Sequence, residues 1–402
     1  MPIKKLTIAV TITLCFIVLF SNLSTAITSI PKDELERDLS FKDKIQALMK
    51  KNHMPSLVAS VIKNDSIVYS NAFGYSNILL RRKASIETIY VIGSISKTIL
   101  STALMQLVEQ EKIGLDENIS HFFPFDIKNP KYPKVNITLR MLLAHQSSLN
   151  YDFTHLILSY PFPDDAMGWI KEHIIPGEKK YSEKLWCDFK PGEESMYSNI
   201  GYLIAGEILE NITNKSVEEY CQENIFKPLG MDNTSFSPSN FDNKNVARPY
   251  IHLIGPFHLP LPYYDLNCAN VFAGVRTNVL DLSRFVMMHM NNGSYKNIKI
   301  LNSTTIEEMH KIQYPNSTMS MYDYQLRLGL GWLYLDVKGV TYSGYNGGAY
   351  GYCCNILIDE KNNSASLTLS NFHFSRIGFR EMKQLKLDVL YEIDSMLLEK
   401  AV

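Results

Sequence analysis

Strand-like segments at the two ends of the chain restrict its fold more than any other feature of the sequence. Residues 56 to 77 alternate apolar and polar side chains on either side of Asn64-Asp65, which predicts a β-hairpin that turns at this pair. Strand-like runs return between residues 328 and 372, whereas residues 114 to 320 mostly place apolar side chains at helical spacing. We therefore predict an α+β fold. One antiparallel sheet is built from the N- and C-terminal segments and flanked by helices, with a mostly helical lobe inserted at about residues 114 to 320.

The N-terminal 26 residues have the pattern of a secretory signal peptide. Lys4 and Lys5 precede an uncharged, apolar run over residues 6 to 20, and small residues follow it. We predict a signal peptide over residues 1 to 26; the alternative is an uncleaved anchor that associates the protein with a membrane. In both cases the remainder, predicted to be one domain over residues 33 to 400, lies outside the cytoplasm: secreted, periplasmic or on the outer face of a membrane.

Charge and cysteine content narrow the function classes. The net charge is −1 and no sustained Lys or Arg stripe occurs, which argues against a nucleic-acid partner. Of six cysteines one lies in the leader, and the odd number that remains predicts at most one or two disulfides, with no pairing favoured. No Cys-x-x-Cys or His-Glu-x-x-His spacing occurs, so we expect no metal site, and no cofactor is required.

The sequence GSISKT lies where an apolar strand-like run gives way to a helix predicted over residues 96 to 113. Within it, Ser94 and Lys97 are three positions apart and therefore share a helix face. A buried lysine amine can assist removal of the serine proton, and the unpaired N–H groups of a helix N-terminus favour negative charge beside the serine. Ser94 is thus a candidate nucleophile with Lys97 as its partner; the alternative is that Ser94 only caps the helix. Ser96 stands beside Lys97 rather than one turn away, and we interpret it as a capping or packing residue.

Two later segments add groups that can carry chemistry. Tyr197-Ser198-Asn199 precedes a long predicted helix, where Tyr197 can serve as a general base and Asn199 can supply amide hydrogen bonds. The alternative for this segment is a capped turn. Residues 344 to 351 contain four glycines in a strand-like setting, which either border a substrate cleft or form a plain bulge or bend.

In this order the three segments resemble the signature motifs of the serine β-lactamase and penicillin-recognising family, of which the first is Ser-x-x-Lys. The similarity is greatest to class C β-lactamases and to related D-alanyl peptidases, D-aminopeptidases and esterases. Supporting motifs between about residues 40 and 395 include NAFGYSN, ITLRMLLAHQSSL, PLGMDNTSF, FAGVRTNVLDLSRF and LGLGW. The resemblance implies a β-lactamase/transpeptidase-like fold and a single catalytic domain.

The resemblance also assigns roles to individual residues. It implies that Ser94 is the nucleophile, that Lys97 is its partner in proton transfer, and that Tyr197 is the base. It further implies substrate contacts from Asn199, Tyr345, Asn346, Gly347 and Gly348. The backbone N–H groups of Ser94 and Gly348 would form an oxyanion hole. The implied reaction is acylation of Ser94 followed by hydrolysis of the acyl-enzyme by water.

The chain departs from the family pattern in two places. Tyr345-Asn346-Gly347 stands where the family has Lys-Thr-Gly or His-x-Gly, so a neutral phenol replaces a group that can be cationic. Ser148, in the HQSSL motif, stands where relatives commonly have glycine, and we expect a local effect on loop geometry. Because strong carboxylate recognition is weakened, an esterase or peptidase acting on a small-molecule or peptide substrate is favoured over a true β-lactamase.

Two alternatives remain open. The chain can be a family member that has lost turnover and acts as a binding or sensor protein, since a fold can persist without its chemistry. A lipase of the α/β-hydrolase class is disfavoured because the chain contains no Gly-x-Ser-x-Gly elbow.

Overall fold

A computed structural model of the protein describes residues 41 to 150, 161 to 254, 257 to 321, 324 to 337, 339 to 374 and 391 to 398. The chain divides into two units, Met1–Lys44 and Ile45–Val402, and the second contains all the strands described here. The predicted signal peptide or anchor lies outside the described residues. Among the residues that are described, no helix is long and apolar enough to cross a membrane.

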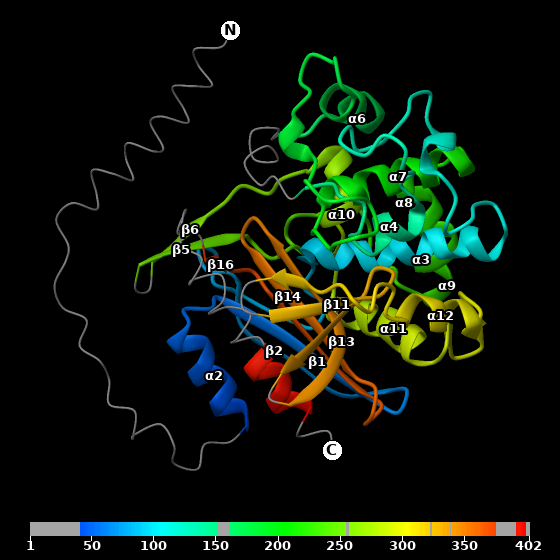
Figure 1. The fold of residues 1–402 in the computed structure, drawn as a ribbon. Helices are drawn as coiled ribbons and strands as arrows, with labels where there is room; N and C mark the ends of the chain where they lie inside the picture. The colour runs from blue at the N-terminus through cyan, green and yellow to red at the C-terminus, as the bar shows by residue number, and fades with distance from the viewer. Residues whose placement is uncertain are drawn as a thin grey trace, which may run out of the picture. The chain divides into compact units, whose positions relative to one another are not determined.

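A nine-stranded sheet organises the larger unit, and its strands run in the order β10-β11-β12-β13-β14-β15-β1-β2-β3 (Figure 1). Their bounds are β1 Ser56–Lys63, β2 Ser66–Asn77, β3 Arg82–Lys83, β10 Met319–Met321, β11 Tyr324–Leu328, β12 Leu333–Val337, β13 Val340–Ala349, β14 Tyr352–Asp359 and β15 Ser364–Ser370. All pairs along this sheet are antiparallel.

Segments from the two ends of the chain meet in the middle of this sheet. β1 pairs with β15 in a register that places Val58 opposite Leu369. The hairpin of β1 and β2 turns at Asn64 and Asp65, whose φ angles of 45° and 65° are those of a tight two-residue hairpin turn. The predicted α+β fold, with one antiparallel sheet built from both ends, is therefore confirmed.

Helices pack on both faces of the sheet. α11 (Val279–Met290) contacts β1 and β15, and its Ser283 Oγ donates to Ser60 Oγ at 3.0 Å. On the opposite face, the helical residues 391 to 398 place Asp394 against Asn355 and Thr368 of the sheet. Because successive strand residues point to opposite faces, the sheet buries apolar side chains in two layers.

The remaining helices belong mainly to the segment between β3 and β10, apart from α2, which precedes the sheet. Their bounds are α2 Phe41–Lys51, η2 Gly93–Ile95, α3 Ser96–Glu109, η3 Ile119–Phe122, α4 Leu139–Leu143, α6 Ala166–Ile174, η4 Glu183–Leu185, α7 Asn199–Thr213, α8 Val217–Cys221, η5 Gln222–Phe226, α9 Lys227–Leu229, η6 Pro238–Asn240, η7 Asn267–Ala269, α10 Asn270–Ala273 and α12 Ser303–His310. The helix predicted from residue 96 is present as α3, and it is buried almost all round.

The segment over residues 114 to 320 also contains strands that periodicity did not indicate. β5 (Tyr250–Ile254) and β6 (Phe257–Pro260) form a sheet with β16 (His373–Phe374). Two further small sheets join β4 (Tyr90–Val91) with β7 (Arg276–Thr277), and β8 (Ser294–Tyr295) with β9 (Ile298–Lys299). Runs of two to five residues are too short to show a period in the sequence.

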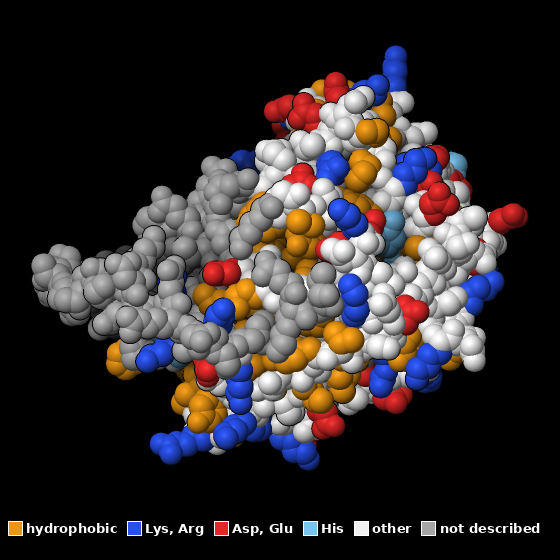
Figure 2. All heavy atoms as spheres, turned by 90° about the horizontal axis from the view of Figure 1, so that it is seen from below, with side chains coloured by type: hydrophobic (Ala, Val, Ile, Leu, Met, Phe, Trp, Pro, Cys, Tyr) orange, Lys and Arg blue, Asp and Glu red, His pale blue; other side chains and the backbone are white. Residues whose placement is uncertain are grey.

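The surface carries charges of both signs, and the described cysteines lie inside. On the face seen in Figure 2, Lys and Arg side chains are interspersed with Asp and Glu. The five cysteines of the described ranges are buried, and none of them forms a disulfide there.

Candidate active site

Ser94 lies in a short 3₁₀ turn between β4 and α3. Neither this turn nor α3 has a side-chain N-cap, so Ser94 does not cap the helix. Ser96 Oγ instead donates to Gly93 O at 2.6 Å and accepts from Val275 N, which is a packing role. The hydroxyl of Ser94 is therefore left to other partners.

Those partners are Lys97 and Tyr197. Lys97 Nζ lies 3.2 Å from Ser94 Oγ, and the Tyr197 hydroxyl donates to the same oxygen at 2.8 Å. Tyr197 comes from the loop before α7, which Ser198 caps by accepting from Gly201 N at 3.1 Å. Residues that are 103 positions apart thus meet on one serine hydroxyl.

Lys97 is buried, and it forms no ion pair with a carboxylate of the described residues. Its side chain is fully inaccessible, its Nζ donates to Phe272 O of α10 at 2.9 Å, and the Tyr197 and Phe272 ring centroids lie 5.1 Å away. Burial lowers the pKa of Lys97 well below its usual 10.5. The environment therefore favours the neutral amine, which can accept a proton from Ser94.

Tyr345 of β13 lies on the site side of the sheet, where it meets a residue that the sequence did not single out. His145 Nε2 and the Tyr345 hydroxyl are 3.3 Å apart, and Tyr345 also hydrogen-bonds the Tyr197 side chain. Both rings are buried; burial lowers the pKa of His145 and raises that of Tyr345. The signal for His145 in the sequence was its position in the HQSSL motif.

The glycines of β13 allow this strand to approach the serine turn. Beyond Gly344, β13 pairs only with β14, so its other edge faces the turn. A Cβ atom on Gly347 would lie 1.8 Å from Ile92 O, and one on Gly93, whose φ is +55°, would lie 2.7 Å from Gly348 N. The backbone at Ser94 and Gly348 can therefore lie close together, as an oxyanion hole requires.

The other two substrate-contact candidates differ in position. Asn199 is the first residue of α7, and its Oδ1 is buried with no hydrogen-bond partner among the described residues. Asn346 pairs with Asn355 across β13 and β14, so its side chain points to the opposite face from Tyr345. Asn346 therefore does not join the cluster around Ser94.

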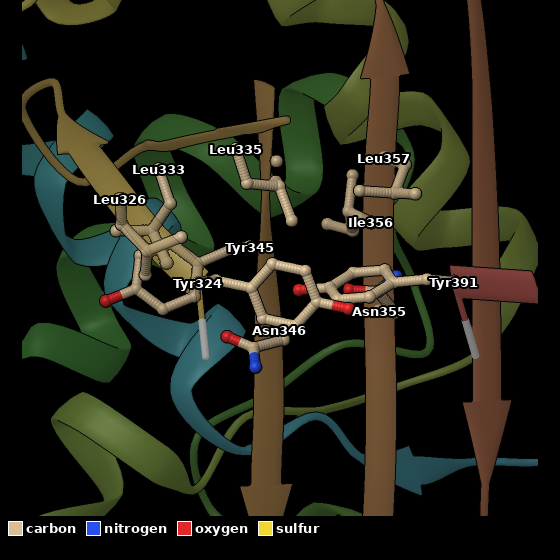
Figure 3. Close-up of a pocket in the computed structure, with 11 residues that line it drawn as sticks. Tyr324, Leu326, Leu333, Leu335, Tyr345, Asn346, Asn355, Ile356, Leu357 and Tyr391 are labelled. Carbon is tan, nitrogen blue, oxygen red and sulfur yellow. The ribbon is translucent and has the colours of Figure 1, made fainter. Parts of the chain in front are cut away.

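A pocket lies beside Asn346, and Tyr345 also contributes to its lining. Figure 3 shows Asn346 and Asn355 beside Tyr324 and Tyr391, whose ring centroids are 5.3 Å apart. Ser94, Lys97 and Tyr197 do not line this pocket.

Ser148, the second departure from the family pattern, has a φ of 58°, a region that favours glycine. Its Oγ accepts from Asn129 Nδ2 at 3.0 Å, which holds the loop in this conformation.

The described residues contain no group of three or more His, Cys, Asp or Glu side chains arranged to hold a metal ion.

The fold and the cluster on Ser94 define the class of protein: one in which the serine of a Ser-x-x-Lys pair lies between the lysine amine and a tyrosine hydroxyl. The Beta-lactamase family model matches residues 41 to 390, and the chain belongs to that family, which confirms the resemblance seen in the sequence.

Individual relatives are distant. The chain is 29% identical over 202 residues to "Protein flp" of Staphylococcus aureus (50% of this chain, 39% of the relative). It is 27% identical over 283 residues to "N-acetylmuramyl-L-alanine amidase" of Bacillus subtilis, covering 63% of each chain. The chain thus spans less than two thirds of the length of these relatives.

Solved structures show the same fold. The octameric penicillin-binding protein homologue from Pyrococcus abyssi superposes with a TM-score of 0.70 at 26% identity, covering 82% of this chain and 72% of that chain. The D-amino acid amidase from Ochrobactrum anthropi SV3 complexed with L-phenylalanine amide gives 0.72 at 19% identity, covering 90% and 99%. EstCE1, a hydrolase with promiscuous acyltransferase activity, gives 0.65 at 19% identity, covering 89% and 98%.

Proposed function

We propose that the protein hydrolyses an ester, amide or peptide bond through an acyl-enzyme on Ser94. The observation that carries this proposal is the position of Ser94 Oγ between Lys97 Nζ at 3.2 Å and the Tyr197 hydroxyl at 2.8 Å. A serine oxygen becomes a useful nucleophile when one neighbour can take its proton and another can supply one to the leaving group.

Acylation begins as the neutral amine of Lys97 takes the proton of Ser94. The Ser94 oxygen bonds to the carbonyl carbon, and the oxyanion that forms is stabilised by the N–H groups of Ser94 and Gly348. Tyr197 gives its proton to the leaving nitrogen or oxygen as that bond breaks. The acyl-enzyme then stands beside a Lys97 ammonium and a Tyr197 phenolate.

Deacylation returns both protons. The Tyr197 phenolate takes a proton from water, and the resulting hydroxide attacks the acyl carbon. Ser94 leaves with the proton of the Lys97 ammonium, so all three side chains regain their starting states. Tyr197 is thus the acid in the first half and the base in the second.

Two features support a neutral acyl group that carries an N–H. Asn199 Oδ1 is a buried acceptor without a partner in the described part of the chain, and a substrate amide would satisfy it. Tyr345 brings no cation to the strand beside the serine, so a substrate carboxylate gains little there. The amidases among the similar proteins agree with this substrate class.

The test is the intact mass of the purified chain after treatment with a fluorophosphonate, compared with its Ser94→Ala variant. We expect one adduct that Ser94→Ala abolishes and that the matched Ser96→Ala variant retains. No adduct on folded protein would overturn the proposal in favour of a binding or sensor protein. The untreated wild-type enzyme is then assayed for turnover of esters, D-amino-acid amides and β-lactams.

A further inference from the structure

His145 holds the segment that carries Tyr197 at two points. Its backbone oxygen accepts from Met196 N at 2.9 Å, and its Nδ1 accepts from Ser198 N at 3.1 Å. The imidazole and Tyr197 ring centroids are 4.5 Å apart. His145 therefore hydrogen-bonds to the residues immediately before and after Tyr197 and packs on its ring.

The backbone of His145 is itself held in an uncommon conformation. Its φ is 55°, in the left-handed region that side chains with a Cβ rarely adopt. Such conformations persist where the surroundings over-determine them, and they concentrate at functional sites. The two hydrogen bonds of His145 to residues 196 and 198 hold its backbone in this conformation.

The Ser198 amide also determines where the imidazole proton lies. A backbone N–H can only donate, so Nδ1 is the bare nitrogen and a neutral imidazole carries its proton on Nε2. Nε2 must then donate to the Tyr345 hydroxyl, 3.3 Å away. With its oxygen accepting from His145, Tyr345 is left to donate its own proton to Tyr197.

We infer that His145 and Tyr345 are positioning residues that orient the Tyr197 proton toward Ser94. Each group donates a hydrogen bond to the next, from Ser198 N–H through His145, Tyr345 and Tyr197 to the serine oxygen. Beyond the serine, Lys97 Nζ donates a hydrogen bond to Phe272 O at 2.9 Å. The backbone donor at Ser198 thus fixes the direction of the hydrogen bonds from His145 to the serine oxygen.

This inference rests on the proposed function, and it changes the role of Tyr345 from a substrate contact to a support for Tyr197. Donation from Tyr345 also stabilises the Tyr197 phenolate that forms during acylation. The titratable groups that face Tyr197 are Lys97 on α3, His145 after α4 and Tyr345 on β13. Tyr202 on α7 packs against Lys97 and His145.

The first test replaces only the hydroxyl. Tyr345→Phe should lower kcat roughly tenfold or more with KM nearly unchanged, because the lost donation acts on proton transfer and not on substrate binding. Its alkaline limb of kcat/KM should move to higher pH, since Tyr197 loses the donor that stabilises its phenolate. The matched control is Tyr352→Phe, which removes a buried 2.6 Å hydrogen bond to Ala247 O outside the site.

The second test separates the two nitrogens of His145. His145→Gln can keep a donor near Tyr345 and should retain more kcat than His145→Asn, which can keep only the acceptor for Ser198 N. Wild-type kcat in Tyr345→Phe, or equal kcat in the two His145 variants, would overturn the inference.

The two proposals fail differently. If the wild-type enzyme forms no fluorophosphonate adduct, the proposed function is wrong. If the wild-type enzyme is labelled and active and the variants keep its kcat, only the positioning role is wrong. Should Tyr345→Phe not fold, the comparison of the two His145 variants decides the question.

Discussion

At the scale of single residues, burial rather than a charged partner determines what Lys97 can do. Its amine is fully buried among aromatic rings and hydrogen-bonds a backbone carbonyl. Desolvation disfavours the ammonium, so the pKa falls well below 10.5. Burial can therefore favour Lys97 as a base without a charged partner.

This predicts a pH dependence with a definite sign. The value of kcat/KM should rise as pH rises through the pKa of Lys97, and this limb should lie well below the ordinary lysine range. Lys97→Arg should lose more than about tenfold in kcat at every pH, because a guanidinium keeps its proton. A pH–rate profile of both enzymes checks this; appreciable activity in Lys97→Arg would contradict it.

Gly347 gives a steric prediction. A Cβ there would lie 1.8 Å from Ile92 O, so Gly347→Ala must push β13 away from the serine turn. We expect kcat to fall by roughly a hundredfold, because small misplacements at a reacting centre are costly. Gly114→Ala, whose Cβ meets nothing closer than 3.6 Å, is the control and should keep its activity. Steady-state kinetics measure kcat for both variants. Equal kcat values for Gly347→Ala and Gly114→Ala would contradict the packing argument.

At the scale of elements, a buried carboxyl attaches the C-terminal helix to the sheet. Asp394 accepts from Asn355 Nδ2 at 2.6 Å, from Thr368 Oγ1 at 3.3 Å and from Ser366 Oγ. Burial raises the pKa of Asp394 to about 7, although these three hydrogen bonds act in the opposite direction. The contact between helix and sheet therefore depends on pH.

The folded carboxyl binds a proton more tightly than the unfolded one, whose pKa is about 3.9. Its contribution to the free energy of unfolding is therefore present below pH ~4 and is lost as pH rises to about 7. Relative to Asp394→Asn, the wild-type protein should become progressively less stable from pH 5 to pH 8. Urea unfolding at several pH values measures this difference, and a difference independent of pH would contradict it.

At the scale of the whole molecule, packing stabilises the fold without cross-links in the described ranges. Cys187, Cys221, Cys268 and Cys354 are buried, and burial raises the pKa of each thiol, for Cys187 to about 11 and for Cys268 to about 12. Buried thiols with raised pKa values react slowly. Export of the chain, predicted from its N-terminus, stays a prediction.

We therefore predict that these thiols are alkylated only after unfolding. Peptide mass spectrometry with iodoacetamide, before and after denaturation, should show labelling in the denatured sample alone, and reductant should leave Tm unchanged. Disulfide-linked peptides from the folded protein would show that the thiols are paired instead.

Sequence reasoning predicted those parts of the fold and site that depend on local pattern. Alternation around Asn64-Asp65 predicted the hairpin, and helical spacing after Ser94 predicted α3, because periodicity records which face is buried. The resemblance supplied Ser94, Lys97 and Tyr197, which the structure brings together. It could not show that Asn346 points away from this cluster, since strand register is needed to know a residue's face.

The sequence by itself determined the fold class, the hairpin at Asn64-Asp65, the family, and the residues that can act as nucleophile and proton carriers. Only the tertiary structure decided what surrounds them. Burial by segments remote in the chain favours the neutral amine of Lys97. His145 becomes a partner of Tyr345, 200 positions away, because β13 packs against the loop after α4. Such effects depend on burial and on distances of a few ångströms between segments remote in the chain, which no local pattern records.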